Sequence, residues 1–345
     1  MEYPINKKML AISIFMFVIT TFIPLNRLFP FHLFSPVPEK INPFDRAKEK
    51  LHERVNTYKL QNVLSFAPPV SATADYDKAT AYAVIDFDSG EIVTQKNGQT
   101  KLPIASITKV MSSIVALDLM HPQDLCTVSE HAAATQPTKI GVVPGQQLSV
   151  EELLNAALLT SANDAVQVLK ECTDTAYGQP VFIQAMNEKV KFIGLKNSEF
   201  SNPQGFDNPH NYSTVEDLAV ISNYAVTHYP LLAQIVKKDH EILTANEYHQ
   251  EYYLNNWNGL LDVYPNVMGV KIGNTNEAGT TTAVVSERNG KRIVVVLLGA
   301  PDILNRDLWA SELLDVGFEK TAGLAAISVT ENQLRDKYST WKYFN

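Results

Sequence analysis

The chain has 345 residues and a formal net charge of −8, from 29 lysines and arginines against 37 aspartates and glutamates. This acidic balance argues against a nucleic-acid-binding protein, which usually carries a basic surplus. A hydrophobic fraction of 45% and a charged fraction of 19% describe a globular chain of one large or two small domains. Two cysteines exclude a small disulfide-stapled fold and a four-cysteine zinc site, and the eight histidines form no H-E-x-x-H motif of a metallohydrolase.

The N-terminal residues 1–25 predict a membrane anchor. Lys7 and Lys8 precede an uncharged apolar run from Met9 to Leu25, residues 9–25, whose length lies at the short end of the about 17–25 residues of a spanning helix. A cleaved signal peptide has a similar layout, but here bulky residues follow the run where small residues would mark cleavage. We therefore expect an uncleaved single-pass anchor rather than a removed signal.

Three further segments follow the anchor. Residues 26–76 combine prolines with a charged, helix-like stretch and are expected to form a stalk. Residues 77–322 contain the strong periodic patterns and predict one globular domain, and residues 323–345 are expected to be a tail. Strands are predicted at 81–87, 91–95, 266–273, 280–287 and 292–298, and helices at 106–120, 163–172, 180–194, 214–229 and 305–319.

Strands at both ends of the domain and helices in its middle indicate an α/β (α+β) fold. We expect one antiparallel sheet built from both ends of the domain, flanked by helices and with an inserted helical lobe. A capping box from Ser149 to Glu152 opens a further helix in this lobe. The dipeptide Asn289-Gly290 predicts a two-residue hairpin between the last two strands.

Ser106 and Lys109 stand three residues apart at the start of a predicted helix. This spacing places them on the same helix face. A lysine whose pKa is lowered by burial can remove the hydroxyl proton of a serine and make it nucleophilic. Unpaired N–H groups at the helix start would stabilise a developing oxyanion. On its own, the same spacing also fits a serine that caps the helix and a lysine that is exposed on the surface.

Two later motifs, taken singly, also have a purely structural interpretation. Ser161 and Asn163 lie between two helices, where both residue types are also common as N-caps. Lys271, Gly273, Asn274 and Thr275 lie on a late strand. The glycine there permits close approach of another chain, although an edge strand with a protective lysine has the same pattern.

Together and in this order, the three motifs resemble S-x-x-K, S-x-N and K-T-G of the penicillin-recognising serine hydrolases. The flanking residues, including Ser201-Asn202-Pro203-Gln204-Gly205 and Gly273-Asn274-Thr275, are similar to those of the D-alanyl-D-alanine carboxypeptidases of the low-molecular-mass penicillin-binding family. The resemblance extends over about residues 78–320 and implies a β-lactamase/transpeptidase-like fold.

The resemblance also implies a reaction. Ser106 would be the nucleophile that attacks the terminal D-Ala-D-Ala bond of a peptidoglycan stem peptide, with Lys109 as the general base and Ser161 as the proton relay. Asn163 would hold the substrate amide and orient Lys109. Lys271, Gly273, Asn274 and Thr275 would bind substrate, with Lys271 attracting its carboxylate and the backbone N–H groups of Ser106 and Asn274 forming the oxyanion hole. β-Lactams would be covalent inhibitors, and neither a metal nor an organic cofactor is implied.

The sequence departs from the family pattern at Ile272, where the motif has threonine. The missing hydroxyl would normally donate to the substrate carboxylate, and a hydrogen bond to a charged group contributes about 1.5–3 kcal/mol. Its loss would reduce efficiency by roughly ten- to a hundredfold. Because side chains alternate along a strand, the amide of Asn274 shares a face with Ile272 and is a possible substitute.

Several alternatives stay open at this stage. A β-lactamase or a D,D-endopeptidase would belong to the same superfamily, and a weakened peptidoglycan-binding module would also account for Ile272. The expected location is the bacterial cell membrane, with the domain outside the cytoplasm. A disulfide between Cys126 and Cys172 is permitted in that compartment but does not follow from the sequence.

Overall fold

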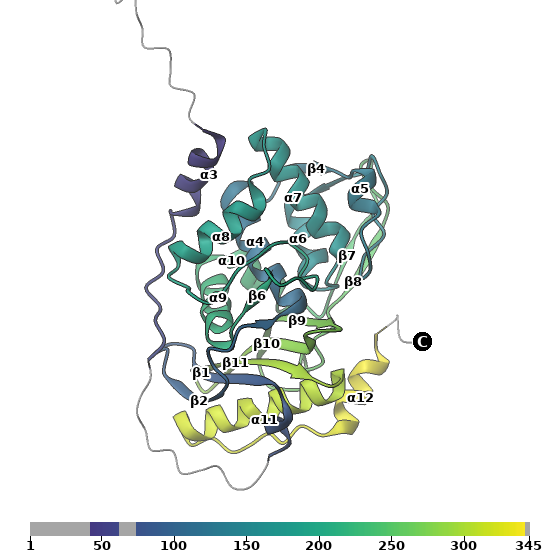
Figure 1. The fold of residues 1–345 in the computed structure, drawn as a ribbon. Coiled ribbons are helices and arrows are strands. Elements are labelled where there is room, and N and C mark those ends of the chain that lie inside the picture. The colour runs from purple at the N-terminus through teal and green to yellow at the C-terminus, as the bar shows by residue number, and fades with distance from the viewer. Residues whose placement is uncertain (1–41, 62–73, 342–345) are drawn as a thin grey trace, which may run out of the picture. The chain divides into compact units, whose positions relative to one another are not determined.

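The structure is a computed structural model that describes residues 42–61 and 74–341 (Figure 1). Its centre is a five-stranded sheet in the order β2-β1-β11-β10-β9, in which all neighbouring strands are antiparallel. The strands are β1 (Ala81–Asp86), β2 (Ile92–Lys96), β9 (Val267–Thr275), β10 (Gly279–Arg288) and β11 (Lys291–Ala300). The sheet therefore combines both ends of the domain, as the sequence predicts.

The three middle strands are covered on both faces, which explains their nearly continuous apolar sequences. All six residues of β1 are buried, and so is the centre of β11. Helix α11 (Ile303–Ala322) contacts β11, β10 and β1, and α9 (Val215–His228) contacts the same three strands. Asn289 and Gly290 have positive φ values of 52° and 76°, so the predicted tight turn joins β10 to β11.

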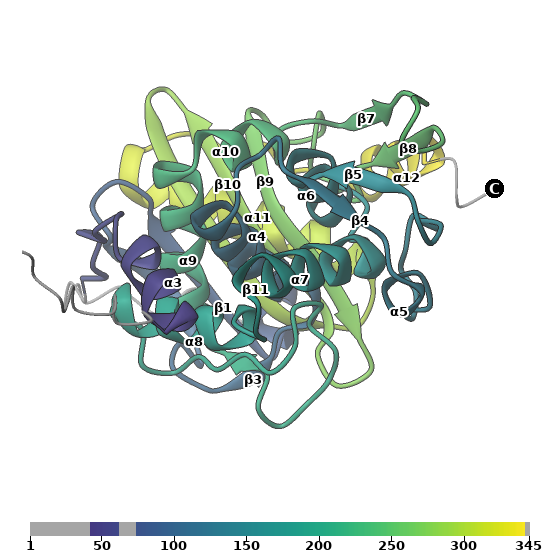
Figure 2. The same ribbon diagram turned by 90° about the horizontal axis from the view of Figure 1, so that it is seen from above.

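The inserted lobe is helical and surrounds α4 (Thr108–Leu119), which contacts five of the other α-helices (Figure 2). Helix α6 begins at the predicted capping box, in which Ser149 and Glu152 exchange hydrogen bonds. The other helices here are α5 (Glu130–Ala133), α6 (Val150–Leu158), α7 (Asn163–Tyr177), α8 (Phe182–Phe192) and α10 (Pro230–Ile235). Three two-stranded ribbons complete it: β3 (Leu102–Pro103) with β6 (Tyr212–Ser213), β4 (Leu125–Thr127) with β5 (Gln147–Ser149), and β7 (His240–Leu243) with β8 (Tyr252–Asn255).

Cys126 of β4 and Cys172 of α7 form a disulfide with an S–S distance of 2.11 Å. The sequence left this pairing open, because the two residues are separated by 46 positions and no local pattern brings them together. The bond fastens the β4–β5 ribbon to α7, the helix that begins at Asn163.

Part of the predicted stalk packs against the domain. Residues 43–61 include α3 (Pro43–Leu51) and an extended segment after it. The buried Lys189 ammonium donates to the Leu51 carbonyl at 2.6 Å, and the Tyr224 hydroxyl donates to the Arg54 carbonyl at 2.5 Å. Backbone hydrogen bonds link Gln61 to the start of β2. These contacts show that residues 43–61, predicted as part of a stalk, pack against the domain.

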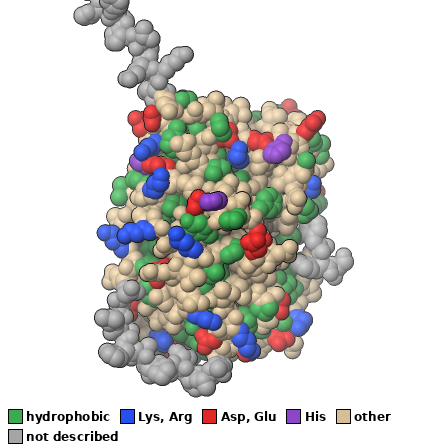
Figure 3. Space-filling view, in the orientation of Figure 1, with side chains coloured by type: hydrophobic (Ala, Val, Ile, Leu, Met, Phe, Trp, Pro, Cys, Tyr) green, Lys and Arg blue, Asp and Glu red, His purple; other side chains and the backbone are tan. Residues whose placement is uncertain are grey.

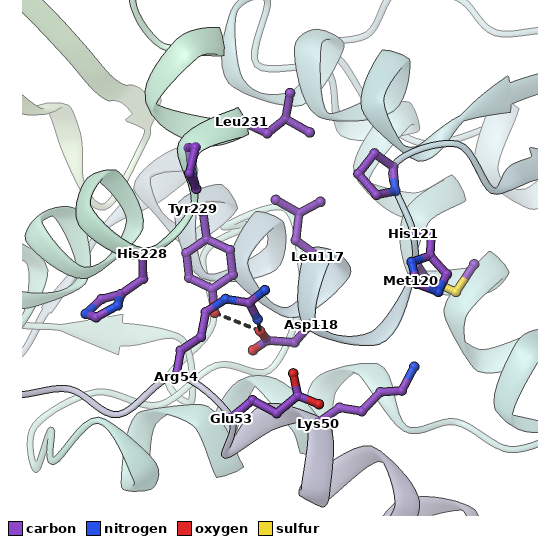
Figure 4. A pocket seen from close by; sticks show the side chains of 12 residues that line it. Lys50, Glu53, Arg54, Leu117, Asp118, Met120, His121, His228, Tyr229 and Leu231 are labelled. Carbon is purple, nitrogen blue, oxygen red and sulfur yellow. Dashed lines mark hydrogen bonds and ion pairs between the residues drawn. The ribbon is translucent and has the colours of Figure 1, made fainter.

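Asp118 is the centre of this docking and lies in a hollow of about 430 Å³ (Figure 4). Its fully buried carboxylate receives hydrogen bonds or ion pairs from Arg54, Lys189 and Tyr229, each at 2.8 Å. None of the residues predicted from the sequence motifs lines this hollow.

The chain after α11 is also ordered. The Asp315 carboxylate accepts hydrogen bonds from the backbone N–H groups of Ile327 and Ser328, and α12 (Glu331–Ser339) follows with Leu334 fully buried. The sequence predicts only a tail here, because residues 323–345 are too few to form a second domain.

Acidic and basic side chains are interspersed over the face of the domain shown in Figure 3. The predicted anchor at residues 9–25 lies outside the described residues. Within 42–61 and 74–341, the structure contains no helix of the length and apolarity that a membrane crossing requires.

We expect Asp118→Asn to lower the free energy of unfolding by about 3–5 kcal/mol, because it leaves the fully buried Lys189 ammonium without its partner. Urea denaturation followed by circular dichroism measures this loss. Asp75→Asn is the matched control, since it breaks an exposed ion pair with Lys78 and should cost less than about 1 kcal/mol. Equal losses in the two variants would contradict the assigned role of Asp118.

Candidate active site

Ser106 lies in a short 3-10 turn, Ala105–Ile107, that leads directly into α4. The Lys109 ammonium nitrogen is 2.8 Å from Ser106 Oγ, so the i, i+3 spacing places both groups on one face as predicted. Ser106 is half-buried, whereas Lys109 is fully buried. The serine is therefore reachable from a pocket and its lysine partner is not.

Lys109 is held by groups from three separate segments. Besides Ser106, its Nζ donates to Asn163 Oδ1 at 2.7 Å and to the Gln204 carbonyl at 2.8 Å. Asn163 is the first residue of α7, and its own amide donates to the Gln136 carbonyl at 3.1 Å. The lysine side chain thus has three acceptors and a fixed position.

Burial and the nearby Lys271 ammonium lower the pKa of Lys109 well below its ordinary value, although the Asp164 carboxylate opposes them. Burial and the Arg306 guanidinium lower the pKa of Lys271 to about 7. A lysine that is neutral near pH 7 has a free lone pair and can accept a proton. The buried Lys109 amine thus lies within hydrogen-bond distance of Ser106 Oγ and has a lowered pKa, the two properties that a base toward this hydroxyl requires.

Two glycines allow other chain segments to lie against the backbone of the Ser106 turn. A Cβ atom on Gly273 of β9 would lie 2.7 Å from the Ser106 nitrogen. A Cβ atom on Gly205 would lie 1.9 Å from the Ala105 carbonyl oxygen, and Gly205 also has a φ of +93°. Glycine is therefore required on both sides of the Ser106 turn.

A pocket of about 280 Å³ opens at Ser106. Ser161 and Asn274 line it together with Gly273, so four of the predicted residues meet there. Ser161 has a positive φ of 63°, a conformation uncommon for serine, and lies two residues before α7. Ile272 and Asn274 both line this pocket, as strand alternation predicts for a shared face.

Lys271 and Thr275, also predicted to bind substrate, are not among the residues that line this pocket. Lys271 is buried next to the pocket, and its ammonium donates to the Ile272 carbonyl at 2.9 Å. The Thr275 hydroxyl donates to Asp207 Oδ1 at 2.6 Å, and Asp207 also accepts from the Glu277 backbone. Thr275 thus ties the β9–β10 turn to the loop that contains Gly205.

Sequence reasoning assigned no role to three residues of the site. Arg306 lines the pocket as a fully buried cation, paired with both oxygens of Asp307 at 2.7 and 2.8 Å. Trp341 lines it from the segment predicted to be a tail. Gln204, quoted only as part of a motif, supplies a carbonyl to Lys109. No local pattern marks Arg306 or Trp341, because long-range packing alone brings them here.

Comparison with known proteins places the chain among enzymes of one kind. The sequence model of the D-alanyl-D-alanine carboxypeptidase family matches residues 69–302. A D-alanyl-D-alanine carboxypeptidase of Bacillus subtilis is 28% identical over 75% of this chain and 68% of its own length. A relative of the same name from Mycobacterium tuberculosis is 32% identical over 70% of this chain and 82% of its own length. The chain covers 62% of a similar carboxypeptidase from Haemophilus influenzae.

Solved structures give the same result. Penicillin-binding protein 5 from Haemophilus influenzae is 30% identical, with a TM-score of 0.63 over 70% of each chain. A Streptomyces DD-transpeptidase is 25% identical, with a TM-score of 0.65 over 70% of this chain and 97% of its own. The sheet and helical lobe described above are therefore the fold of the penicillin-binding DD-peptidases.

We expect Gly205→Ala to destabilise the protein by about 1–3 kcal/mol more than Gly194→Ala, as measured by urea denaturation. Both glycines have a positive φ, +93° and +85°, so both variants carry backbone strain. Only the Gly205 variant adds a collision, since no heavy atom lies within 4 Å of a Cβ on Gly194. Equal losses would show that the segments beside Ser106 move apart freely.

Proposed function

The chain belongs to the D-alanyl-D-alanine carboxypeptidase family of serine peptidases, and we propose that it removes the terminal D-Ala of peptidoglycan stem peptides through an acyl-enzyme on Ser106. The observation that carries this proposal is the contact between Ser106 Oγ and the buried Lys109 amine at 2.8 Å. Binding of peptidoglycan without catalysis requires neither this contact nor the Lys109–Asn163 contact at 2.7 Å. Their presence therefore favours an enzyme over a weakened binding module.

In the proposed acylation, neutral Lys109 takes the hydroxyl proton as Ser106 Oγ attacks the carbonyl carbon between the two D-alanines. The backbone N–H groups of Ser106 and Asn274 stabilise the oxyanion. The Ser161 hydroxyl, in the same pocket, passes the proton from Lys109 to the nitrogen of the leaving D-Ala as the C–N bond breaks. Water then attacks the ester, with Lys109 again as the base, and restores the Ser106 hydroxyl.

The substrate carboxylate requires positive charge near the leaving residue. Arg306 lines the pocket. The buried Lys271 ammonium donates to the Ile272 carbonyl, and the Arg306 guanidinium lowers its pKa. We assign the carboxylate to this cationic end, with the Asn274 amide replacing the hydroxyl that Ile272 lacks. In the part of the chain that the structure describes, no glutamate lines the pocket. This favours a peptidase over a β-lactamase that activates its deacylating water with a glutamate.

The proposed location is the outer side of a bacterial cell membrane, with residues 9–25 as the anchor. The disulfide between Cys126 and Cys172 supports an oxidising compartment. The docked segment 43–61 would connect the anchor side of the chain to the domain. β-Lactams, which mimic the substrate, are the proposed covalent inhibitors of Ser106.

We expect the purified full-length protein to release D-Ala from a stem pentapeptide and to lose this activity in Ser106→Ala. Coupled D-amino acid oxidase detection measures the release. Ser339→Ala, which removes a serine of the same x-x-Lys spacing from the end of α12, is the matched control and should retain the activity. D-Ala release that persists in Ser106→Ala would rule out the proposed nucleophile.

Restoring the motif hydroxyl should improve the enzyme. We expect Ile272→Thr to raise kcat/KM for D-Ala release by no more than roughly tenfold, the lower end of what a hydrogen bond to a charged group contributes, because the Asn274 amide already donates to the same carboxylate. Ile272→Val has nearly the same shape as the threonine without its hydroxyl and should bring no gain. Equal gains in the two variants would mean that bulk, not hydrogen bonding, limits the natural site.

A further inference from the structure

An aromatic side chain just after the C-terminal helix α12 lines the active-site pocket. Trp341 follows α12 directly, is 4% exposed and lines the same pocket as Ser106. The family model ends at residue 302, so Trp341 lies beyond the part that it matches. This side chain is thus a feature of this chain that the family comparison does not account for.

The helix is held firmly against the domain. Leu334 is fully buried, and the Lys337 ammonium contacts Asp239 at 2.6 Å and Asp262 at 3.2 Å. The Tyr338 hydroxyl donates to Asp307 at 2.8 Å and lies 3.3 Å from the Ile303 carbonyl. Figure 1 shows α12 beside the start of α11, the helix that carries Ile303 and Asp307.

These contacts place Trp341 at the cationic end of the pocket. Its ring lies 4.8 Å from the ring of Tyr338, whose hydroxyl binds Asp307. Asp307 in turn holds the Arg306 guanidinium with both of its oxygens. Because the leaving residue's carboxylate is assigned to Arg306, Trp341 lies at the leaving-group end.

The pocket is small for what it must hold. Its volume of about 280 Å³ is at the lower limit of ligand pockets, about 300 Å³. Its apolar lining consists of Trp257, Ile272, Ile303 and Trp341, and the Arg306 guanidinium donates to the Trp257 carbonyl at 3.3 Å. A second stem peptide attached through a lysine-type side-chain amine would bring no adjoining carboxylate to the Arg306 guanidinium, and the indole ring of Trp341 limits the room for its added length.

We propose that Trp341 restricts the enzyme to a leaving group that is one terminal amino acid with a free carboxylate, so that it trims stem peptides but does not cleave the cross-links between them. This inference rests on the proposed carboxypeptidase function. In both reactions Ser106 forms an ester with the same acyl group. They differ in the departing amine, which is free D-Ala in trimming and the side-chain amine of a second stem peptide in cross-link cleavage.

The test compares two substrates with the full-length protein: a monomeric stem pentapeptide and a cross-linked dimeric muropeptide, with products quantified by liquid chromatography and mass spectrometry. The natural enzyme should release D-Ala from the monomer at least a hundredfold faster than it cleaves the dimer. In Trp341→Ala, the ratio of dimer cleavage to D-Ala release should rise at least tenfold.

Trp341→Phe is the matched control, because it keeps an aromatic wall and should shift the ratio less than Trp341→Ala. Trp341→Leu tests the same point if the alanine variant does not fold, and a penicillin adduct on Ser106 shows that each variant retains an intact nucleophile. An unchanged ratio in the shortened variants, or a natural enzyme that cuts both substrates equally well, would overturn the inference. A natural enzyme that forms the penicillin adduct and releases no D-Ala would instead overturn the proposed function, and this inference with it.

Discussion

The site depends on the burial of one amine. Lys109 has no exposure to water, and this burial together with Lys271 holds its pKa well below that of an ordinary lysine. A charged Lys109 would be useless as a base and costly to bury, whereas a neutral one fits its surroundings of a hydroxyl, an amide oxygen and a carbonyl. The fold supplies those partners from the Ala105–Ile107 turn, from the start of α7 and from the loop that contains Gln204.

The same enclosure explains several features remote in sequence. Gly205 and Gly273 exclude side chains from both sides of the Ser106 turn, so that the loop and β9 can seal the lysine from water. The disulfide at Cys172 fastens the helix whose first turn carries Asn163. At the other end of the pocket, α12 supports Arg306 through Asp307 and adds an aromatic wall. A closed pocket of this kind suits the removal of one residue from a chain end.

Much of this could be predicted from local sequence. The Ser106–Lys109 spacing, the strand patterns at both ends of the domain and the turn at Asn289 depend on neighbours within a few residues, and the structure places them as expected. Contacts between distant segments could not be predicted. Trp341 reaches the pocket only through the docking of α12, and the Thr275 hydroxyl, predicted to bind substrate, donates to Asp207 in the loop that contains Gly205.

The most direct test of the account is the pH dependence of Ser106 acylation. Intact-mass spectrometry gives the first-order rate of adduct formation at saturating penicillin, and only the unprotonated Lys109 amine can take the serine proton. Because the pKa of Lys109 is lowered, the rate should rise with pH, level off before the range of an ordinary lysine, about 10.4, and stay constant above that plateau. A rate that still rises in proportion to hydroxide between about pH 8 and 10 would show that Lys109 remains charged and would contradict the account.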